Sequence, residues 1–168
     1  DQKPGTSGLR KSTLRFQEDH YLEIFIEATL QSFSCIQGST LILGGDGRYG
    51  NKRAIRKILS ICAAHQVGKV IVGKNGLLST PAASNLIRIN NALAGIILSA
   101  SHNPGGIAGD FGVKVNVSNG GPAAEVVTNK IFNKSQYLTS YKTCEVKIPD
   151  LSNCGSYFIN EMNLEIVD

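Results

Sequence analysis

Short apolar runs that alternate with amphipathic segments constrain the fold of this 168-residue chain more than any other feature. Residues 39–43, 69–72 and 94–98 are apolar runs bounded by glycine or polar residues, which is typical of buried strands. One intervening segment has apolar residues at helical spacing, at Ala54, Ile55, Ile58, Leu59 and Cys62. A second helix is expected from residue 80 to about residue 91. Strands that alternate with helices predict an α/β domain whose sheet is mainly parallel.

A further strand predicted over residues 111–117 makes the sheet mixed. Its residues alternate with period two, which separates Phe111, Val113, Val115 and Val117 from Lys114 and Asn116. Only about 11 residues separate it from the run at 94–98, too few for a crossover helix, so the two strands are expected to be antiparallel. The predicted fold class is therefore α/β, a three-layer domain with a mixed, mainly parallel sheet flanked by helices.

Local patterns predict the remaining segments of the first half. Residues 1–13 are polar and are expected to form a loop. An amphipathic helix is expected over residues 18–34, with its apolar face formed by Leu22, Phe25, Ile26, Leu30 and Phe33. Thr80 is the predicted cap of the helix at 80–91, since threonine accepts from free N–H groups and Pro81 suits the first helical position.

The pattern weakens toward the end of the chain. Gly120-Gly121-Pro122 is expected to precede a helix that buries Val126, Val127 and Ile131. Beyond Ser135 the periodicity fades, and residues 149–155 contain a proline and a glycine that interrupt it. No internal repeat and no low-complexity linker is found.

The composition indicates an ordinary folded protein. With 42% hydrophobic and 18% charged residues, neither a disordered nor a membrane class is favoured. No apolar run approaches the ~20 residues that span a bilayer, and no signal-peptide pattern opens the chain, so a cytosolic location is expected. The four cysteines are widely spaced and form no C-x-x-C pair, at Cys35, Cys62, Cys144 and Cys154. Free thiols are therefore expected in preference to a disulfide framework or a zinc site.

The formal net charge of +4 is small for a nucleic-acid-binding protein. The one basic group, Lys52-Arg53 with Arg56-Lys57, follows a helical pattern and is interpreted as a solvated helix face. We therefore expect neither a nucleic-acid partner nor a membrane partner.

The octet Ser99-Ala100-Ser101-His102-Asn103-Pro104-Gly105-Gly106 follows the apolar run at 94–98. A turn at this point carries Ser101 to the end of a sheet, where open α/β folds place their chemistry. A serine hydroxyl is a weak nucleophile that needs a neighbouring base and a cationic group before it can accept a phosphoryl group. Glycines at 105, 106 and 109 are expected to allow positive φ and close approach of a phosphate to backbone N–H groups.

The octet resembles the active-serine signature Thr-Ala-Ser-His-Asn-Pro-Gly-Gly of the α-D-phosphohexomutases, with Ser99 in place of the usual threonine. Three further segments resemble that family in the same order, namely Gly5-Thr6-Ser7-Gly8-Leu9-Arg10-Lys11, Gly44-Gly45-Asp46-Gly47-Arg48, and Gly109-Asp110-Phe111-Gly112-Val113-Lys114 with Asn119-Gly120-Gly121-Pro122. The context resembles the phosphoglucomutase branch, and residues 135–163 resemble the family only loosely. Because Ser99 keeps a hydroxyl, we expect a modest effect on the packing of the loop.

The resemblance implies reversible conversion of glucose 1-phosphate to glucose 6-phosphate through a phosphoserine and glucose 1,6-bisphosphate. It also implies that residues 1–168 are the first of several domains, with domains II–IV absent from this chain. The expected partners are a hexose phosphate and those domains of the same polypeptide. The chain alone is therefore expected to fold and to lack mutase turnover.

By the same resemblance, Ser101 is the nucleophile that carries the phosphoryl group. His102 and Lys114 are both candidates for the general acid–base at the sugar hydroxyl. Histidine titrates near neutrality without help, whereas lysine needs burial or a cationic neighbour to lower its pKa. The choice between them stays open, and each has a second interpretation: His102 as a brace of the loop and Lys114 as a charge that compensates phosphate.

Arg10 is the candidate phosphate clamp, because a guanidinium presents a planar fork suited to phosphate. Thr6, Ser7 and Asn103 are the other candidates for substrate or phosphate contact. Asn103 and Asp110 are more readily interpreted as shaping the loop than as reacting groups.

The resemblance further implies Mg²⁺, bound by the phosphate on Ser101 and by an Asp-Gly-Asp-Gly-Asp loop that this chain lacks. Asp46 lies in a Gly-Asp-Gly context, but a single carboxylate cannot supply the oxygen ligands that Mg²⁺ takes. Asp46 is therefore interpreted as a turn-stabilising residue.

A second hypothesis is a non-catalytic relative of the mutases that serves as a structural, secretory or cytoskeletal partner. Ser99 is the one change in the serine loop that favours it, and the intact His102-Asn103-Pro104-Gly105-Gly106 speaks against it.

Overall fold

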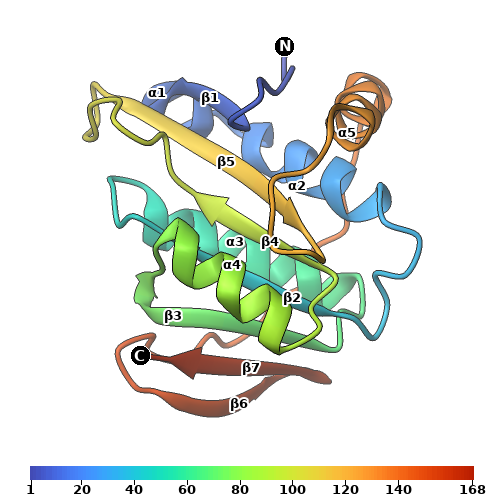
Figure 1. Cartoon of the computed structure of the whole chain (residues 1–168), viewed down its shortest axis with the longest axis vertical. Coiled ribbons are helices and arrows are strands. Elements are labelled where there is room, and N and C mark those ends of the chain that lie inside the picture. The colour runs from blue at the N-terminus through green and yellow to red at the C-terminus, as the bar shows by residue number, and fades with distance from the viewer.

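The computed structural model describes all residues from 1 to 168 and forms a single seven-stranded sheet with helices on both faces (Figure 1). The strands are β1 (Leu9–Ser12), β2 (Thr40–Gly45), β3 (Lys69–Leu77), β4 (Ala94–Leu98), β5 (Asp110–Val117), β6 (Gly155–Ile159) and β7 (Met162–Val167). The helices are α1 (Thr13–Gln17), α2 (Tyr21–Gln31), α3 (Asn51–Ala64), α4 (Thr80–Ile89) and α5 (Glu125–Tyr137).

The sheet is mixed, as predicted, in the order β1-β5-β4-β2-β3-β7-β6. β2 pairs in parallel with both β3 and β4, and β7 pairs in parallel with β3. β5 is antiparallel to β4, which confirms the expectation from the short connection. β1 is antiparallel to β5 and therefore runs in the same direction as β4. The carboxyl ends of β1, β2, β3, β4 and β7 all meet at one edge of the sheet.

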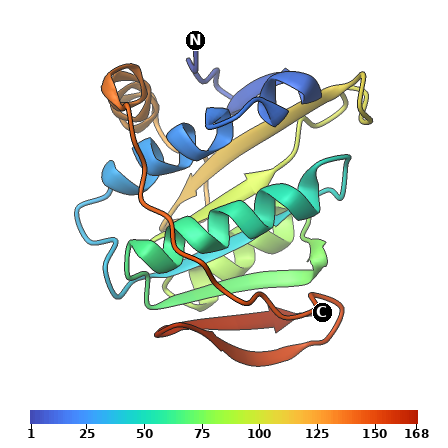
Figure 2. The same ribbon diagram turned by 180° about the vertical axis from the view of Figure 1, so that it is seen from behind.

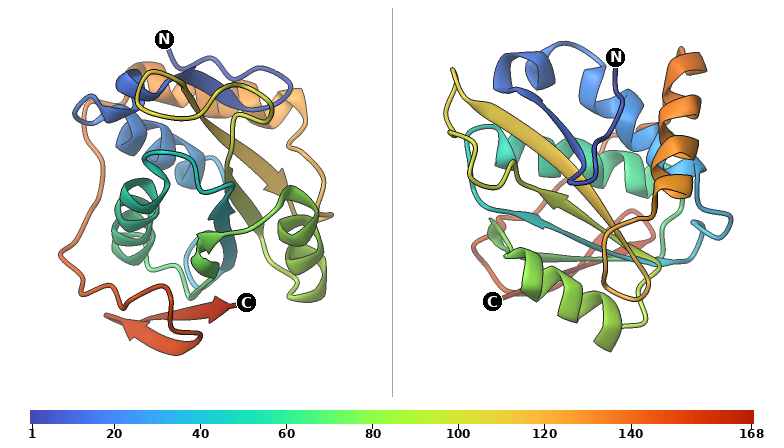
Figure 3. Two further views of the ribbon diagram at one scale, coloured as in Figure 1. Left: turned by 90° about the vertical axis from the view of Figure 1, so that its left-hand side faces the viewer. Right: turned by 45° about the horizontal axis from the view of Figure 1, so that its top comes forward.

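Helices flank the sheet on both faces and give the three layers that the sequence predicts (Figure 3). α2 and α3 cover one face, and α5 packs on α2. This side holds the main core of 31 buried residues, to which α3 contributes Ile55, Ile58 and Leu59. α4 covers part of the other face, where Ala83 and Ile87 pack on Ile42, Ile71 and Ile97.

The structure corrects the expected start of the chain. Residues 1–13 are not all loop, because Leu9–Ser12 form β1 and Thr13 begins α1. A strand of four mostly polar residues has no sequence pattern by which it could be predicted. It is extended because it pairs with β5. The helix expected over 18–34 is shorter, since α2 begins at Tyr21 after His20, which has a φ of 67°.

Two details of the predicted helices are also wrong. The cap of α4 is Ser79, whose hydroxyl accepts from the backbone N–H of Ala82, so Thr80 is inside the helix. On α5, Ile131 is buried as predicted, but Val126 is 79% exposed. α5 packs on α2 with only a narrow apolar strip, which leaves Val126 facing outward.

The last third of the chain holds two strands that the sequence pattern did not predict. After α5, residues 138–150 run without regular secondary structure across α2 and α3 (Figure 2), and we call this segment the strap. The chain then forms the hairpin β6–β7, in which β7 extends the sheet beyond β3. Met162, Leu164 and Ile166 alternate into the core, a short pattern that becomes decisive only when β3 is available for pairing.

The expectations for cysteines and surface charge are confirmed. All four cysteines are free, with Cys62 buried and Cys35 and Cys154 exposed. Burial raises the pKa of the Cys62 thiol to about 12. On α3, Lys52, Arg53 and Arg56 are exposed, and Lys57 pairs with Glu23. No helix of the chain is long and apolar enough to cross a bilayer.

Candidate functional site

The loop that carries Ser101 connects β4 to β5 at the carboxyl edge of the sheet, where the ends of β1 and β2 also lie (Figures 1 and 3). The beginning of α1 holds the far part of this loop. The Thr13 hydroxyl donates to the carbonyl of Gly106 at 2.8 Å, and the Thr13 N–H donates to the carbonyl of Gly109 at 2.8 Å. The part of the loop that leads into β5 is therefore attached to α1 as well.

Ser101 is exposed and its hydroxyl contacts a cation. Arg10 Nη2 donates to Ser101 Oγ at 2.6 Å, across 91 positions of sequence. β1 makes this contact possible, because pairing with β5 places Arg10 opposite Gly112, next to the loop. Arg10 Nε is buried and has no hydrogen-bond partner. A guanidinium with an unused buried donor beside a serine hydroxyl suits an added acceptor-rich group on that serine.

Ser101 itself has a φ of 53°, in the left-handed region. A non-glycine residue seldom adopts this conformation, so the loop must hold it in place. The Ser101 N–H donates to Ser99 Oγ at 3.0 Å, and the Ser99 hydroxyl donates to Asp46 Oδ2 at 2.8 Å. The hydroxyl at position 99 therefore has a defined role, and a hydroxyl is the group that serine shares with the threonine of the family signature.

Arg48 connects several parts of the loop. Its Nη2 donates to the Ser101 carbonyl at 3.1 Å, and its Nη1 donates to the carbonyls of Asp110 at 2.8 Å and Asn103 at 3.4 Å. Its side chain is only 7% exposed and pairs with Asp46. Burial acts to raise the pKa of Asp46, but hydrogen bonds from Arg48 and Ser99 outweigh it and hold that pKa below its usual value.

The glycines of the loop differ from expectation. Gly106 has a φ of 99°, as predicted, whereas Gly105 and Gly109 do not adopt positive φ. Gly109 is required for a different reason, because a Cβ there would overlap the carbonyl oxygens of Pro104 and Gly105. Gly112 on β5 is required for the same reason, because a Cβ there would overlap the carbonyl oxygen of Ser99. Close backbone approach, more than positive φ, explains these glycines.

Lys114 lies on the same face of the sheet as Arg10. Arg10 pairs with Gly112 on β5, and Lys114 is two residues further along that strand. The turn formed by residues 5–8 lies beside it, so that Thr6, Gly8 and Lys114 line one small pocket. Lys114 is half-buried and its side chain makes no hydrogen bond or ion pair with the protein, so its charge is free to meet a ligand. Thr6 and Ser7 are exposed at the tip of that turn.

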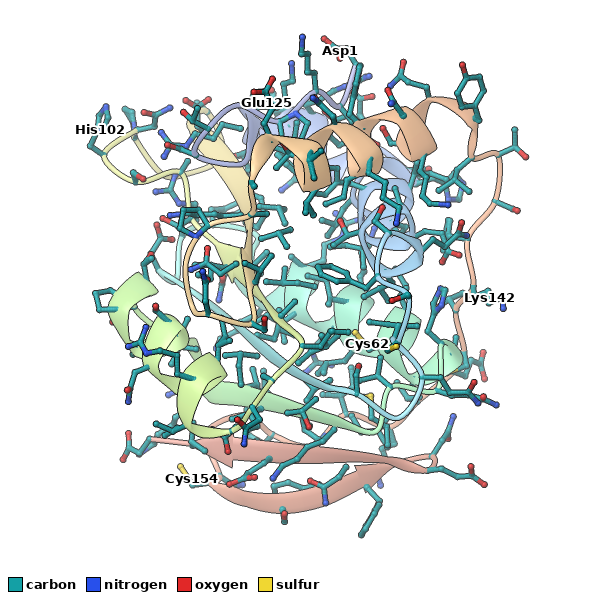
Figure 4. All side chains as sticks on the ribbon, turned by 45° about the vertical axis from the view of Figure 1, so that its right-hand side comes forward. Asp1, Cys62, His102, Glu125, Lys142 and Cys154 are labelled. Carbon is teal, nitrogen blue, oxygen red and sulfur yellow. The ribbon has the colours of Figure 1, made fainter.

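His102 is exposed at the outer end of the loop, where it projects from the body of the protein (Figure 4). It makes no hydrogen bond or ion pair, so it does not brace the loop in this structure. Asn103 does shape the loop, as its Nδ2 donates to Asp110 Oδ2 at 2.9 Å. The structure thus brings Arg10 into contact with Ser101 and places Lys114 on the same face of the sheet as Arg10. The His102 side chain makes no hydrogen bond with these residues.

The residues of this chain alone do not form a metal site. No group of three or more His, Cys, Asp or Glu side chains lies close enough together to hold an ion. Asp46 accepts hydrogen bonds from Arg48 and Ser99, so its carboxylate is already neutralised. This agrees with its interpretation as a turn-stabilising residue.

Sequence reasoning did not assign a role to Arg48. Its segment, Gly44-Gly45-Asp46-Gly47-Arg48, does resemble a family motif, and this resemblance was the one feature of the sequence that could have pointed to Arg48. The contacts that define its role reach between 53 and 62 positions along the chain, so they become visible only in the tertiary structure.

Fold and site together define an α/β/α domain that presents a serine, an arginine and a lysine at one edge of a mixed sheet. Comparison with known proteins agrees with this class. The family described as "Phosphoglucomutase/phosphomannomutase, alpha/beta/alpha domain I" matches residues 1–142. The chain belongs to the phosphoglucomutase/phosphomannomutase family, in the part that family describes as domain I.

Individual relatives are similar over the whole chain. A phosphoglucomutase of Aspergillus fumigatus is 53% identical over 168 residues, which are 99% of this chain and 30% of the relative. A phosphoglucomutase of Rhizobium radiobacter is 48% identical over 100% of this chain and 31% of the relative. The chain therefore spans less than a third of the length of these two relatives.

Solved structures show the same fold. The open form of an exocytosis-sensitive phosphoprotein from Paramecium, pp63/parafusin, described as a phosphoglucomutase, matches with a TM-score of 0.94 and 38% identity. The match covers 100% of this chain and 33% of that one. A phosphomannomutase-like protein from Thermus thermophilus matches 78% of this chain and 29% of its own length, with a TM-score of 0.63 and 29% identity.

Proposed function

We propose that this chain is the serine-bearing domain of a phosphoglucomutase, which interconverts glucose 1-phosphate and glucose 6-phosphate. The observation that carries the proposal is the 2.6 Å contact between Arg10 Nη2 and Ser101 Oγ at the carboxyl edge of the sheet. The Arg10 guanidinium, which already contacts that oxygen through Nη2, would offer charge-assisted hydrogen bonds to a phosphoryl group on it. The names of the relatives support the same activity.

In the proposed reaction Ser101 Oγ and a sugar hydroxyl exchange one phosphoryl group. A bond forms between Ser101 Oγ and phosphorus while the bond from phosphorus to the sugar oxygen breaks. The serine proton passes to a base and returns to the sugar oxygen that leaves. In the interconversion the phosphoserine first runs this step in reverse and gives its phosphoryl group to the free hydroxyl of glucose 1-phosphate, which forms glucose 1,6-bisphosphate, the intermediate and activator. Ser101 Oγ then takes the phosphoryl group from the other position of the sugar, which releases glucose 6-phosphate and restores the phosphoserine.

Lys114 and His102 remain the two candidates for the acid–base role. Lys114 shares a face of the sheet with Arg10 and is half-buried. His102 is exposed on the loop and projects away from the body of the protein. Both side chains lack a protein partner, which suits groups that meet a substrate.

The binding roles are part of the same proposal. Arg10 would hold the phosphate on Ser101 by charge-assisted hydrogen bonds. Thr6 and Ser7, on the exposed turn beside Lys114, would contact a phosphate or sugar hydroxyl of the substrate. Asn103 would act indirectly, because its amide is engaged with Asp110.

Mg²⁺, domains II–IV and a cytosolic location complete the proposal. Since no three His, Cys, Asp or Glu side chains of this chain lie close enough together to hold a metal ion, Mg²⁺ bound through the phosphate on Ser101 would need ligands from outside residues 1–168. Those ligands would come from domains II–IV of the same polypeptide. A cytosolic location is compatible with four free cysteines.

Phosphoryl transfer to the serine tests this function directly. We expect full-length protein incubated with Mg²⁺ and labelled glucose 1,6-bisphosphate to carry the label on Ser101, as located by peptide mass spectrometry. Ser101→Ala should lose both label and turnover, whereas Ser140→Ala, at an exposed serine of the strap, should keep both. Unlabelled wild-type protein would exclude the proposed function.

The alternative is a non-catalytic member of the family with a structural, secretory or cytoskeletal role. The description of the Paramecium relative as an exocytosis-sensitive phosphoprotein is the observation that favours it. The same labelling separates the two hypotheses, because a non-catalytic protein would neither accept the label nor convert glucose 1-phosphate.

A further inference from the structure

Arg48 holds the loop of Ser101 at three points along the backbone. Its guanidinium donates to the carbonyls of Ser101, Asn103 and Asp110, which are spread from the start of the loop to the first residue of β5. One buried side chain therefore connects the beginning and the end of the loop.

All N–H donors of Arg48 are occupied within the protein. Nε donates to both oxygens of Asp46 at 3.0 Å, Nη1 donates to Asn103 and Asp110, and Nη2 donates to Asp46 and Ser101. Asp46 also neutralises its charge. Arg48 thus has no donor left for a phosphate, in contrast to Arg10, whose Nε has no partner.

Asp46 joins two contacts that fix the backbone of Ser101 from both sides. The Ser101 N–H is held by Ser99, which donates its hydroxyl proton to Asp46. The Ser101 carbonyl is held by Arg48, which pairs with the same carboxylate. Because the φ of 53° at Ser101 is disfavoured for a non-glycine residue, loss of these contacts shifts the backbone toward other conformations.

We propose that Arg48 is a positioning residue, which acts with Asp46 and Ser99 to keep Ser101 in the left-handed conformation that places its hydroxyl on Arg10. This inference rests on the proposed phosphoryl transfer to Ser101. Arg48 does not touch the reacting atoms, so its loss should slow the transfer while substrate binding is retained.

Arg48→Lys in the full-length protein tests the proposal. Lysine keeps the charge beside Asp46 but cannot make the same set of contacts. We expect labelling of Ser101 by glucose 1,6-bisphosphate in a single turnover to slow about 10- to 100-fold, as for a misplaced reacting group. The kcat should fall by a similar factor, while the KM for glucose 1-phosphate changes by less than about twofold.

Hydrogen exchange supplies a readout that a loss of stability would not reproduce. In Arg48→Lys, the amide of Ser101 should exchange faster while amides in β2 and α3 keep their wild-type protection. The matched control is Arg53→Lys, an exposed arginine on the first turns of α3, which should keep the wild-type labelling rate and exchange.

Each outcome decides between clear alternatives. A wild-type labelling rate in Arg48→Lys would overturn the proposal, and a raised KM with unchanged kcat would instead make Arg48 a substrate-binding residue. If wild-type protein takes no label, the proposed function fails and not this inference alone. Should Arg48→Lys not fold, Ser99→Ala and Ser99→Thr decide: the proposal requires slow labelling in the first and near-normal labelling in the second.

Discussion

Arg10 and Arg48 reach the same loop, and the use of their N–H groups separates their roles. Arg10 contacts the Ser101 hydroxyl and keeps one buried donor unused, whereas every donor of Arg48 is engaged with backbone or Asp46. An arginine with unused donors is suited to a ligand, and one with none is suited to holding a backbone. A count of free donors thus distinguishes two residues that are identical in type and both far from Ser101 in sequence.

Gly112 yields a prediction at the scale of one residue. A Cβ at this position would overlap the carbonyl oxygen of Ser99, which is backbone and cannot move without shifting the loop. We expect Gly112→Ala to lower the free energy of unfolding by about 1–3 kcal/mol, the usual cost of overpacking. Urea unfolding of the 168-residue chain measures this.

Gly105→Ala is the control for that prediction. A Cβ at Gly105 would be 3.5 Å from Arg48 Cβ, which is ordinary contact, and its φ is not positive. Its effect should stay within about 0.5 kcal/mol, as for unconstrained positions. Equal losses in the two variants would contradict the explanation by close backbone approach.

At the scale of elements, Glu27 joins α2, α3 and the strap. It is 1% exposed, and Oε2 accepts from the Lys142 N–H at 3.0 Å and contacts His65 Nε2 at 2.7 Å. Gln31 donates to Oε1 at 2.7 Å. Burial acts to raise the pKa of Glu27, but these hydrogen bonds outweigh it and the pKa lies below its ordinary value. Lys142 on the strap is seen in Figure 4.

The lowered pKa of Glu27 fixes the sign of a pH effect. Since the folded protein favours the ionised carboxylate, the contribution to stability is present above the pKa of the unfolded chain and is lost as the pH falls through the folded pKa. We expect Glu27→Gln to lower the free energy of unfolding by about 1–3 kcal/mol at pH 7, because buried donors lose their acceptor. The difference from wild type should shrink below pH 4, as measured by urea unfolding across pH.

Glu161→Gln is the matched control, because Glu161 is exposed in the β6–β7 turn and makes no hydrogen bond or ion pair. It should leave the free energy of unfolding within about 0.5 kcal/mol of wild type. A Glu27→Gln difference that is constant from pH 3 to pH 7 would contradict an effect of ionisation.

At the scale of the whole molecule, the carboxyl edge of the sheet is both the candidate site and an apolar surface. Four large apolar side chains on the segments at this edge are at least half exposed, namely Leu14, Tyr49, Leu77 and Ile107. The core, by contrast, is continuous, with 31 buried residues on one side of the sheet. The chain thus has a core of its own, and apolar side chains are exposed around Ser101.

Together with the proposed function, these observations predict that the 168-residue chain folds on its own but is inactive. We expect the 168-residue chain to unfold cooperatively on heating, as followed by circular dichroism, because it has its own core. It should show no conversion of glucose 1-phosphate in a coupled assay, since the proposed metal and sugar ligands lie outside it. Turnover that stays with the fragment through purification would refute this, and full-length protein is the positive control.

The sequence alone was enough to predict the central strands, the long helices and the position of Ser101 at the end of a strand. Buried strands and amphipathic helices have local periodicities, so β2, β4 and α3 could be predicted from patterns within each segment. The antiparallel direction of β5 followed from a connection too short for a crossover. The family-like motifs then identified Ser101, Arg10 and Lys114 as site candidates.

Only the tertiary structure decided the edges of the sheet and the support of the site. β1 and β7 become strands because β5 and β3 offer them hydrogen bonds. The polar segment of β1 has no strand pattern of its own, and the alternation of Met162, Leu164 and Ile166 in β7 is too short to predict a strand by itself. The left-handed backbone of Ser101 and the contacts of Arg48 likewise depend on groups about 50 or more residues apart. Local sequence encodes what a segment can bury, whereas hydrogen bonds between distant segments exist only after the chain has folded.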